Sequence, residues 1–513
     1  MADTRTSTEQ DACYLALKTR DARFDGRFFT GVTSTGIYCR PVCSVRTPRR
    51  ENCRFFWHAA TAEGAGFRPC LRCRPELAPG ANQWSIQDAS SVLAQHAARL
   101  LDQPDGWGES EPSVRALAHR VGVSDRHLRR IFEAQFGVSP MQYLQTRRLL
   151  TAKQLLADTD LPITQVALAS GYASLRRFNA AFVAHYQLNP TQLRRAGGGN
   201  RGRGVSIKLG YRPPYDVDAM IAFMRRRQID GVEWVQAGAA QPVIGRTLQL
   251  RSAGQTCSGW LLARFNLQRC QLELQVDDAL RAALPVVIRR VRDWLDLDAD
   301  PQAIHACLGA DFPDDQGLRV PGALDGFELA VRAVLGQQIT VAAARTLAQR
   351  LVERFGAVVD TPYAELTRLF PSPDTLAASS ADALGQLGIV RQRQRAIQAL
   401  ARACAAGQLR LDAGADVPAT MAALTQLPGI GDWTAHYIAM RALRWPDAFP
   451  SGDVALHKAI GVQGHKQAAQ LAQARSQSWR PWRSYALLRA WNTLPAPGQA
   501  TPQEPAQGAS HAI

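Results

Sequence analysis

The sequence predicts a multidomain protein in which units of different secondary structure follow one another along the chain. Its 513 residues exceed what one hydrophobic core normally serves, since domains typically hold about 100–200 residues. Hydrophobic residues make up 46% and charged residues 20%, which is typical of globular domains. The apolar periodicity changes from helical to alternating and back to helical. We therefore expect several domains, among them a helical unit, a unit with strands and a second helical unit.

Composition shifts indicate where these units begin and end. The Gly-rich run AGGGNRGRG predicts a flexible linker over 196–204, and a tail rich in Pro, Gln and Ala over 496–513 is expected to be disordered. The expected domains are residues 1–85, 86–195, 205–290 and 291–495.

The charge balance favours a polyanionic partner. Lys and Arg total 60 against 44 Asp and Glu, a formal net charge of +16. Nucleic acid is the simplest such partner, although a basic surface kept for solubility stays open. The N-terminus lacks the apolar core of a signal peptide, and no apolar run is long enough for a membrane span. We expect a cytoplasmic protein whose ten cysteines do not form disulfides.

Four cysteines have the spacing of a metal site. Three residues separate Cys39 from Cys43, and two separate Cys70 from Cys73. Four thiolates from two turns suit tetrahedral coordination, so one Zn²⁺ bound by all four is predicted. The spacing by itself favours a purely structural site. The other cysteines fit no ligand spacing and are expected to be buried small residues: Cys13, Cys53, Cys257, Cys270, Cys307 and Cys404.

The wider stretch, from RDARFDGRFF through GIYCRPVCSVR to FRPCLRCRPEL, resembles the zinc domain of the Ada methylphosphotriester repair proteins. The resemblance implies that Cys39 is catalytic as well as a zinc ligand, accepting a methyl group from a DNA phosphotriester once per molecule. A thiolate that becomes a thioether loses its negative charge, so DNA binding should then tighten. Arginines near the cysteines are candidate phosphate contacts: Arg40, Arg46, Arg68, Arg72 and Arg74.

Two helix-turn-helix patterns follow. Each has a short helix, a turn at Gly122 or Gly171, and a basic second helix that Ser124 or Ser174 would cap. Residues 112–195 resemble an AraC-type DNA-binding domain, which implies promoter operator DNA as a partner and RNA polymerase as a further one. The expected DNA-recognition residues are Arg126, Arg129, Arg130, Arg176 and Arg177.

The last part of the chain contains a helix-hairpin-helix pattern. In ALTQLPGIGDWTAHYIAMRAL, Gly429 and Gly431 would let the backbone approach a DNA phosphate closely. Asp453 follows, near the start of a further helix. An aspartate at a helix start is usually a cap. A hairpin followed by an aspartate at this distance resembles the helix-hairpin-helix base-excision glycosylases, and the resemblance implies that Asp453 is catalytic.

Three more stretches, YRPPYDVDAMIAFMRRR, FELAVRAVLGQQITVAAARTLAQRL and WRPWRSYALLRAWN, resemble the AlkA type of 3-methyladenine DNA glycosylase II. In that family a mixed α/β domain precedes the bundle, and VSIKLGY and CQLELQV read as its strands. The resemblance implies a cationic alkylated base flipped out of double-stranded DNA and held over electron-rich rings. The AlkA-type leucine wedge is here Gln338. The implied base pocket comprises Trp433, Tyr437, Trp491 and Gln337.

The sequence lacks the motifs of three related types of DNA-repair protein. The chain lacks the Pro-Cys-His-Arg site of alkylguanine methyltransferases. Trp433 stands where lyase-type relatives carry a lysine, and no cysteine follows Cys404 to hold an iron–sulfur cluster. A monofunctional glycosylase is therefore expected. Alternatively, the chain is a damage-sensing regulator whose glycosylase half binds without excising.

The predicted architecture is a small α+β zinc domain, an all-α double helix-turn-helix domain, a mixed α/β domain and an all-α helix-hairpin-helix glycosylase bundle. The chain is expected to act as a monomer.

Overall fold

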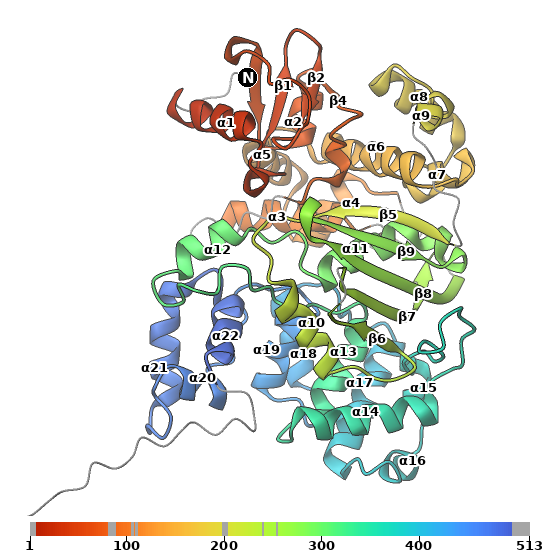
Figure 1. Cartoon of the computed structure of the whole chain (residues 1–513). Helices are drawn as coiled ribbons and strands as arrows, with labels where there is room; N and C mark the ends of the chain where they lie inside the picture. Colours follow the sequence, from red (N-terminus) through yellow and green to blue (C-terminus); the bar gives the residue numbers. More distant parts are fainter. Residues whose placement is uncertain are drawn as a thin grey trace, which may run out of the picture.

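A computed structural model describes residues 7–80, 89–103, 107, 111–196, 204–238, 241–252 and 255–494. Two predicted segments lie outside the described residues. They are the tail expected over 496–513 and the linker expected over 196–204, of which only the two end residues are described. In chain order the described residues form a cysteine module (7–80), a helical module (89–196), a sheet module (204–294) and a bundle module (301–494). The cysteine and helical modules lie above the sheet module, and the bundle module lies below it (Figure 1). This arrangement confirms the predicted fold class.

The cysteine module is a four-stranded sheet with strand order β3-β1-β2-β4 and two flanking helices. β2 pairs in parallel with β4, and the Cys70 amide donates to the Tyr38 carbonyl at 3.0 Å. The chain that leaves β4 therefore passes beside the end of β2. The elements are α1 Ser7–Thr19, β1 Phe29–Val32, β2 Ile37–Cys39, β3 Cys53–Phe56, α2 Ala59–Gly64 and β4 Arg68–Pro69.

The helical module contains the two predicted helix-turn-helix lobes, joined by the long helix α6. Ser124 and Ser174 cap the second helix of each lobe through their side chains, as predicted. Gly122 and Gly171 have φ of +76° and +81°, a conformation that glycine adopts at little cost. The helices are α3 Ala89–Leu101, α4 Val114–Val121, α5 Asp125–Phe136, α6 Pro140–Asp158, α7 Ile163–Ala169, α8 Leu175–Tyr186 and α9 Pro190–Ala196.

The sheet module is an antiparallel sheet of strand order β5-β9-β8-β7-β6. The two predicted strands are β5 and β9, paired with each other. Alternate residues of β5 face inward, which is the period-2 pattern of a half-buried strand. The elements are β5 Val205–Gly210, α10 Val217–Arg226, β6 Glu233–Gln236, β7 Val243–Ser252, β8 Gln255–Asn266, β9 Gln271–Val276 and α11 Leu284–Trp294.

The bundle module packs around two hydrophobic cores, and α19 contributes residues to both. One core receives Ala435 and Ile438, and the other receives Ala439 and Met440. α19 therefore lies along the seam between them. The helices are α12 Pro301–Leu308, α13 Gly326–Leu335, α14 Val341–Phe355, α15 Pro373–Ala378, α16 Ala381–Gly385, α17 Arg391–Ala405, α18 Val417–Thr425, α19 Asp432–Arg441, α20 Val454–Ala459, α21 Ala468–Arg475 and α22 Arg483–Asn492.

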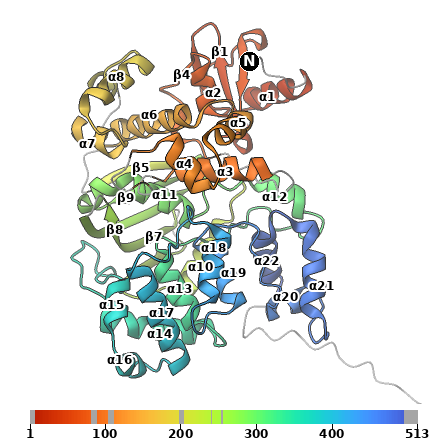
Figure 2. The ribbon, with the colours of Figure 1, turned by 180° about the vertical axis from the view of Figure 1, so that it is seen from behind.

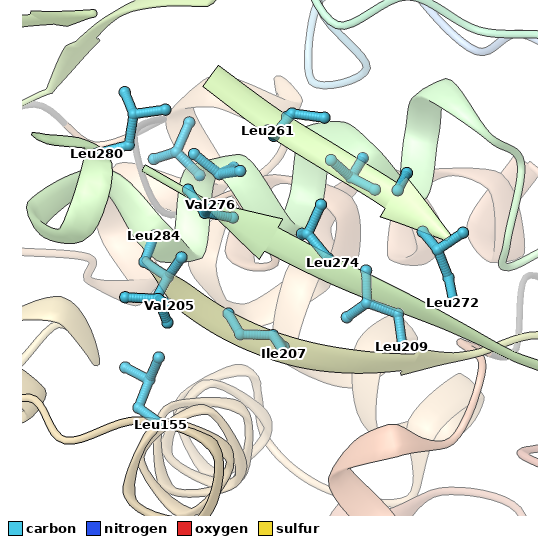
Figure 3. Close-up of a cluster of buried hydrophobic side chains, with 14 of the residues drawn as sticks. Leu155, Val205, Ile207, Leu209, Leu261, Leu272, Leu274, Val276, Leu280 and Leu284 are labelled. Atoms are coloured by element: carbon cyan, nitrogen blue, oxygen red, sulfur yellow. The ribbon is translucent and has the colours of Figure 1, made fainter. Parts of the chain in front are cut away.

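The helical and sheet modules share one hydrophobic core. Leu155 of α6 and the inward side chains of β5 belong to the same buried cluster (Figure 3). The Gln154 amide also donates to the Lys208 carbonyl at 3.1 Å. β5 is an edge strand, and α6 runs beside that edge in both overall views (Figures 1 and 2), so the helix covers an edge that would otherwise be open to pairing. Among the described helices, none is long and apolar enough to span a bilayer.

Candidate functional site

The four predicted metal ligands converge in the cysteine module. β2 ends at Cys39, and the chain leaving β4 brings Cys70 beside it. The sulfurs of Cys39, Cys43, Cys70 and Cys73 all lie within 4.8 Å of one another. Sulfurs at about 2.3 Å from a tetrahedral zinc lie about 3.8 Å apart, so the cluster fits one Zn²⁺. Four thiolates this close together would repel one another strongly, so a cation is needed to keep all the sulfurs deprotonated.

Two of the expected phosphate-contacting arginines, the buried Arg40 and the half-buried Arg74, are instead bound by carboxylates. Arg40 is 5% exposed, and its Nε donates to the Asp25 carboxylate at 2.8 Å. Arg74 pairs with Glu76 at 2.9 Å and with Asp158 at 2.6 Å. The prediction was wrong for both, because a guanidinium held by buried carboxylates is not free to bind a phosphate. Arg46 and Arg72 are exposed, whereas Arg68 is half-buried and donates to Gln187 at 3.2 Å.

The two predicted recognition helices present their arginines to solvent. α5 buries Leu128 and Phe132 against its lobe, while α8 buries Phe178 and Phe182. On the opposite faces the arginines are exposed, although Arg177 lies 3.7 Å from Glu111. The exposed set is Arg126, Arg129, Arg130, Arg176 and Arg177.

Asp453 is the N-cap of α20 and lies between two tryptophans. Its Oδ1 accepts from the Leu456 amide at 2.6 Å and from the Trp491 indole at 2.9 Å. Its Oδ2 accepts from the Trp433 indole at 2.7 Å. Asp453 as a whole is 6% exposed. Three hydrogen-bond donors fix the orientation of this carboxylate. A carboxylate has about four acceptor positions, so one position on Oδ2 remains without a hydrogen bond from these donors.

Two half-buried indoles bind this aspartate, and a third half-buried ring, Tyr437, stacks on one of them. Trp433 and Tyr437 are four residues apart on α19 and stack at 5.1 Å between centroids with 11° between their planes. Burial would raise the pKa of Tyr437, but the Arg441 and Arg227 cations outweigh it and hold that pKa below its usual value. The structure thus brings together Trp433, Tyr437 and Trp491, as the base-pocket prediction requires. All three keep part of their surface in solvent.

Gln337 lies against the hairpin. Its amide nitrogen donates to the Gly429 carbonyl at 2.9 Å and to the Thr434 hydroxyl at 3.0 Å. That nitrogen is therefore committed to the hairpin, and its expected place in the base pocket stays a prediction. Gln338, the expected wedge, is exposed and has φ of +56° at the turn before α14.

Only one of the two hairpin glycines has a backbone conformation that favours glycine. Gly429 has φ of +79°, and a Cβ there would lie 3.1 Å from the Ala396 Cβ. Gly431 is the N-cap of α19 with φ of −92° and open space around it. The hairpin therefore needs glycine at the first position for its backbone conformation, and the second leaves the start of α19 accessible.

Several residues of these sites were not foreseen. Arg441 donates to the Tyr437 hydroxyl at 2.6 Å. The two residues are four apart on α19, and this spacing could have predicted the contact from the sequence. Asp25, the partner of Arg40, carried no signal in the sequence. The expectation that the non-ligand cysteines are buried holds for Cys13 and Cys53 and is wrong for four others, which are half-buried: Cys257, Cys270, Cys307 and Cys404.

Comparison with known proteins gives four family matches that follow one another along the chain. The matching family models are the metal binding domain of Ada over 12–76, a helix-turn-helix domain over 117–196, the AlkA N-terminal domain over 206–325, and the HhH-GPD superfamily of base excision DNA repair proteins over 331–484.

Among curated relatives, the probable bifunctional transcriptional activator/DNA repair enzyme AlkA of Mycobacterium tuberculosis is 40% identical over 511 residues, covering 96% of this chain and 98% of the relative. DNA-3-methyladenine glycosylase 2 of Escherichia coli is 33% identical, covering 56% of this chain and 96% of the relative. The Escherichia coli bifunctional transcriptional activator/DNA repair enzyme Ada is 37% identical, covering 31% of this chain and 42% of the relative. Because the first match runs through all four modules, the chain belongs to the family of fused Ada–AlkA proteins.

Proposed function

We propose that this chain detects and repairs alkylated DNA by two chemistries. Cys39 accepts a methyl group from a DNA methylphosphotriester and thereby controls transcription, and Asp453 supports hydrolytic removal of alkylated bases such as 3-methyladenine. The observation that carries the proposal is the pairing, in one chain, of a four-cysteine cluster beside exposed recognition helices with an aspartate held between two tryptophans.

In the first reaction the Cys39 sulfur attacks the methyl carbon. A sulfur–carbon bond forms, the carbon–oxygen bond breaks, and the phosphodiester oxygen leaves with the electron pair, so no proton is transferred. Bound zinc would keep the sulfurs deprotonated at neutral pH. Among the four ligands, the Cys73 sulfur accepts a hydrogen bond from the Arg40 main-chain amide at 3.3 Å, which stabilises negative charge on that sulfur and lowers its nucleophilicity.

Methylation changes the charge of the cluster. Four thiolates around Zn²⁺ carry about two net negative charges, and the methyl group removes one. One charge pair about 4 Å apart near a protein surface interacts by about 1–4 kcal/mol, depending on the local dielectric. Removing that repulsion toward DNA phosphates tightens binding by the neighbouring recognition helices. The mycobacterial relative is named a transcriptional activator, and we propose activation here too.

In the second reaction the bond between C1′ and the base nitrogen breaks. An N-alkylated purine is cationic and departs as a neutral base, so a strong general acid is unnecessary. The half-buried rings of Trp433, Tyr437 and Trp491 hold the cationic base before cleavage. The remaining acceptor position on Oδ2 of Asp453 stabilises the cationic sugar or receives the proton of the water that adds to C1′.

DNA is bound on both halves. The hairpin at Gly429 binds the backbone without reading sequence, and the exposed arginines of α5 and α8 read the operator. Gln338 fills the space left by the flipped base. RNA polymerase as a partner, a monomeric state and a cytoplasmic location also belong to this proposal, and sedimentation of the purified chain tests the monomeric state.

Release of free 3-methyladenine from methylated DNA tests the glycosylase assignment. The wild-type protein should release the base, whereas Asp453→Asn should retain binding and lose release by at least about 100-fold. Equal release by both proteins would remove Asp453 from the reaction. Binding of methylated DNA without any release by the wild type would favour the regulator that binds without excising.

Mass spectrometry of the protein after exposure to DNA with methylphosphotriesters tests the methyl transfer. The peptide that contains Cys39 should carry one methyl group, and Cys39→Ser should carry none at that position. The matched control is Cys53→Ser, which alters a buried cysteine outside the cluster and should leave the adduct intact. An adduct on Cys43, Cys70 or Cys73 of the wild type would reassign the acceptor.

A further inference from the structure

One arginine of the sheet module reaches into the cysteine module. Arg212 is 1% exposed, although it carries a positive charge. Burial lowers its pKa to about 10, which still leaves it protonated at neutral pH. Its acceptors are main-chain carbonyls of the cysteine module and of the segment between the sheet and bundle modules: Asp25 at 2.7 Å, Pro79 at 3.2 Å, Gly80 at 2.7 Å, Asp298 at 2.9 Å and Ala299 at 3.2 Å.

The first of these acceptors belongs to the residue that holds Arg40. The Asp25 carboxylate binds the Arg40 guanidinium, and both residues are about 5% exposed or less. The same guanidinium donates to the Cys73 carbonyl at 2.9 Å. The main-chain amide of Arg40 donates to the Cys73 sulfur at 3.3 Å. Arg40 directly follows Cys39, so it ties together the two cysteine pairs of the cluster.

Close backbone packing brings the same elements into contact at other points. A Cβ at Gly210, the last residue of β5, would lie 2.5 Å from the Leu77 carbonyl and 3.5 Å from Nη2 of Arg40. A Cβ at Gly26 would lie 2.0 Å from the Pro79 carbonyl and 3.1 Å from Nη2 of Arg212. The end of β5 therefore abuts the side chain that braces the cysteine cluster.

We propose that Arg212 is a positioning residue for the methyl-accepting cysteine site, so that the glycosylase half of the chain fixes the geometry of the sensor half. The connection runs from the Arg212 guanidinium through Asp25 to Arg40, and from Arg40 to both cysteine pairs. The proposal rests on the proposed function for the methyl transfer, but the metal-binding consequences hold without it.

The connection acts on the metal site because hydrogen-bonded partners outside the ligand set orient the ligands. Loss of such a partner typically costs 10–100-fold in metal affinity or activity. Arg40 touches the ligands directly and should show an effect in that range. Arg212 acts one step further away, through Asp25, and its loss should have a smaller effect, about threefold to tenfold.

The test compares Arg212→Met with the matched variant Arg27→Met in the full-length protein. The Arg27 guanidinium binds the Asp300 carboxylate at 2.6 and 2.8 Å, so it joins nearly the same segments without touching Asp25. We expect Arg212→Met to release zinc to a chelating dye about threefold to tenfold faster and to alter the visible spectrum of the cobalt-substituted site. Arg27→Met should stay within about twofold of the wild type on both measurements.

Arg212→Lys covers the case in which Arg212→Met does not fold. Lysine keeps the charge but has a single nitrogen, so it cannot reach all the carbonyls and should give an intermediate zinc-release rate. The double variant Arg40→Met/Arg212→Met tests whether the two arginines act on the metal site through the same connection. If they do, their effects on the zinc-release rate should not be additive.

Equal zinc release in Arg212→Met and Arg27→Met, or additive effects in the double variant, would overturn the proposal. A wild-type protein that binds zinc but accepts no methyl group would instead refute the proposed function, and the zinc-release and cobalt measurements would still test Arg212.

Discussion

Leu155→Ala should weaken the helical and sheet modules together, because this side chain lies in the core that they share. Leu155 is fully buried, and its helix α6 contacts β5. The substitution removes three carbon groups, worth about 0.8 kcal/mol each on transfer from water, and leaves a partly collapsed cavity. We expect a loss of about 3 kcal/mol, which is on the order of a 100-fold change in the unfolding equilibrium.

The assay follows two activities on the same heated samples. Base excision reports the glycosylase half, and binding of operator DNA reports the helical module. In Leu155→Ala the midpoints of thermal loss should fall together for both activities. The matched control is Leu128→Ala, equally buried but in the separate core of the first helix-turn-helix lobe. That control should lower the midpoint for operator binding and leave base excision nearly unchanged. An unchanged excision midpoint in Leu155→Ala would refute a shared core.

Three further predictions concern the hairpin, the recognition helices and pH. Gly429→Ala should lose about 1–2 kcal/mol in a denaturant titration and bind DNA more weakly, since φ is +79° there, whereas Gly431→Ala at φ −92° should be tolerated. Arg129→Gln should lower the slope of log affinity against log salt for operator DNA by about 0.9 if it neutralises one phosphate, and an unchanged slope would exclude that contact. Burial, aided by Arg99, lowers the pKa of His96 from 6.5 to about 4. Between these two pH values the imidazole is neutral in the folded protein and protonated in the unfolded chain, so unfolding takes up a proton. Stability should therefore fall by about 2–3 kcal/mol as the pH drops from 6.5 to 4, and His96→Gln should flatten that dependence in acid-titrated unfolding curves.

Local features of both sites could be predicted from sequence because they depend on short spacings. Ser124 and Ser174 are N-caps, as their positions before apolar helices indicated. The cysteine pairs converge because a metal site constrains the spacing within each pair, and the parallel pairing of β2 with β4 then brings the pairs together. Asp453 lies at the start of a helix, as its position in the sequence indicated. Trp433 and Trp491, which the resemblance to the AlkA-type glycosylases implied as base-pocket residues, bind its carboxylate.

Predictions based on residue type alone were less successful. Arg40 and Arg74 lie near the cysteines and are basic, which favoured phosphate contacts, but carboxylates bind both, and although Glu76 is close to Arg74 in the sequence, one partner of each arginine is not. Asp25 is 15 residues from Arg40, and Asp158 is 84 residues from Arg74. A sequence pattern does not reveal such pairs, because the charge of an arginine is the same whether a carboxylate or a phosphate binds it.

The sequence by itself determined the zinc ligands, the helix caps, the hairpin and the order of the modules, since each depends on spacings within a few turns of chain. Only the tertiary structure decided that the two halves form one body, with Leu155 packed on β5 and Arg212 bound to carbonyls 187 residues away at Asp25. Main-chain carbonyls are present at every residue, so their choice as acceptors leaves no mark in the sequence. Which apolar face covers which depends on how the modules meet, and that is fixed when the chain folds.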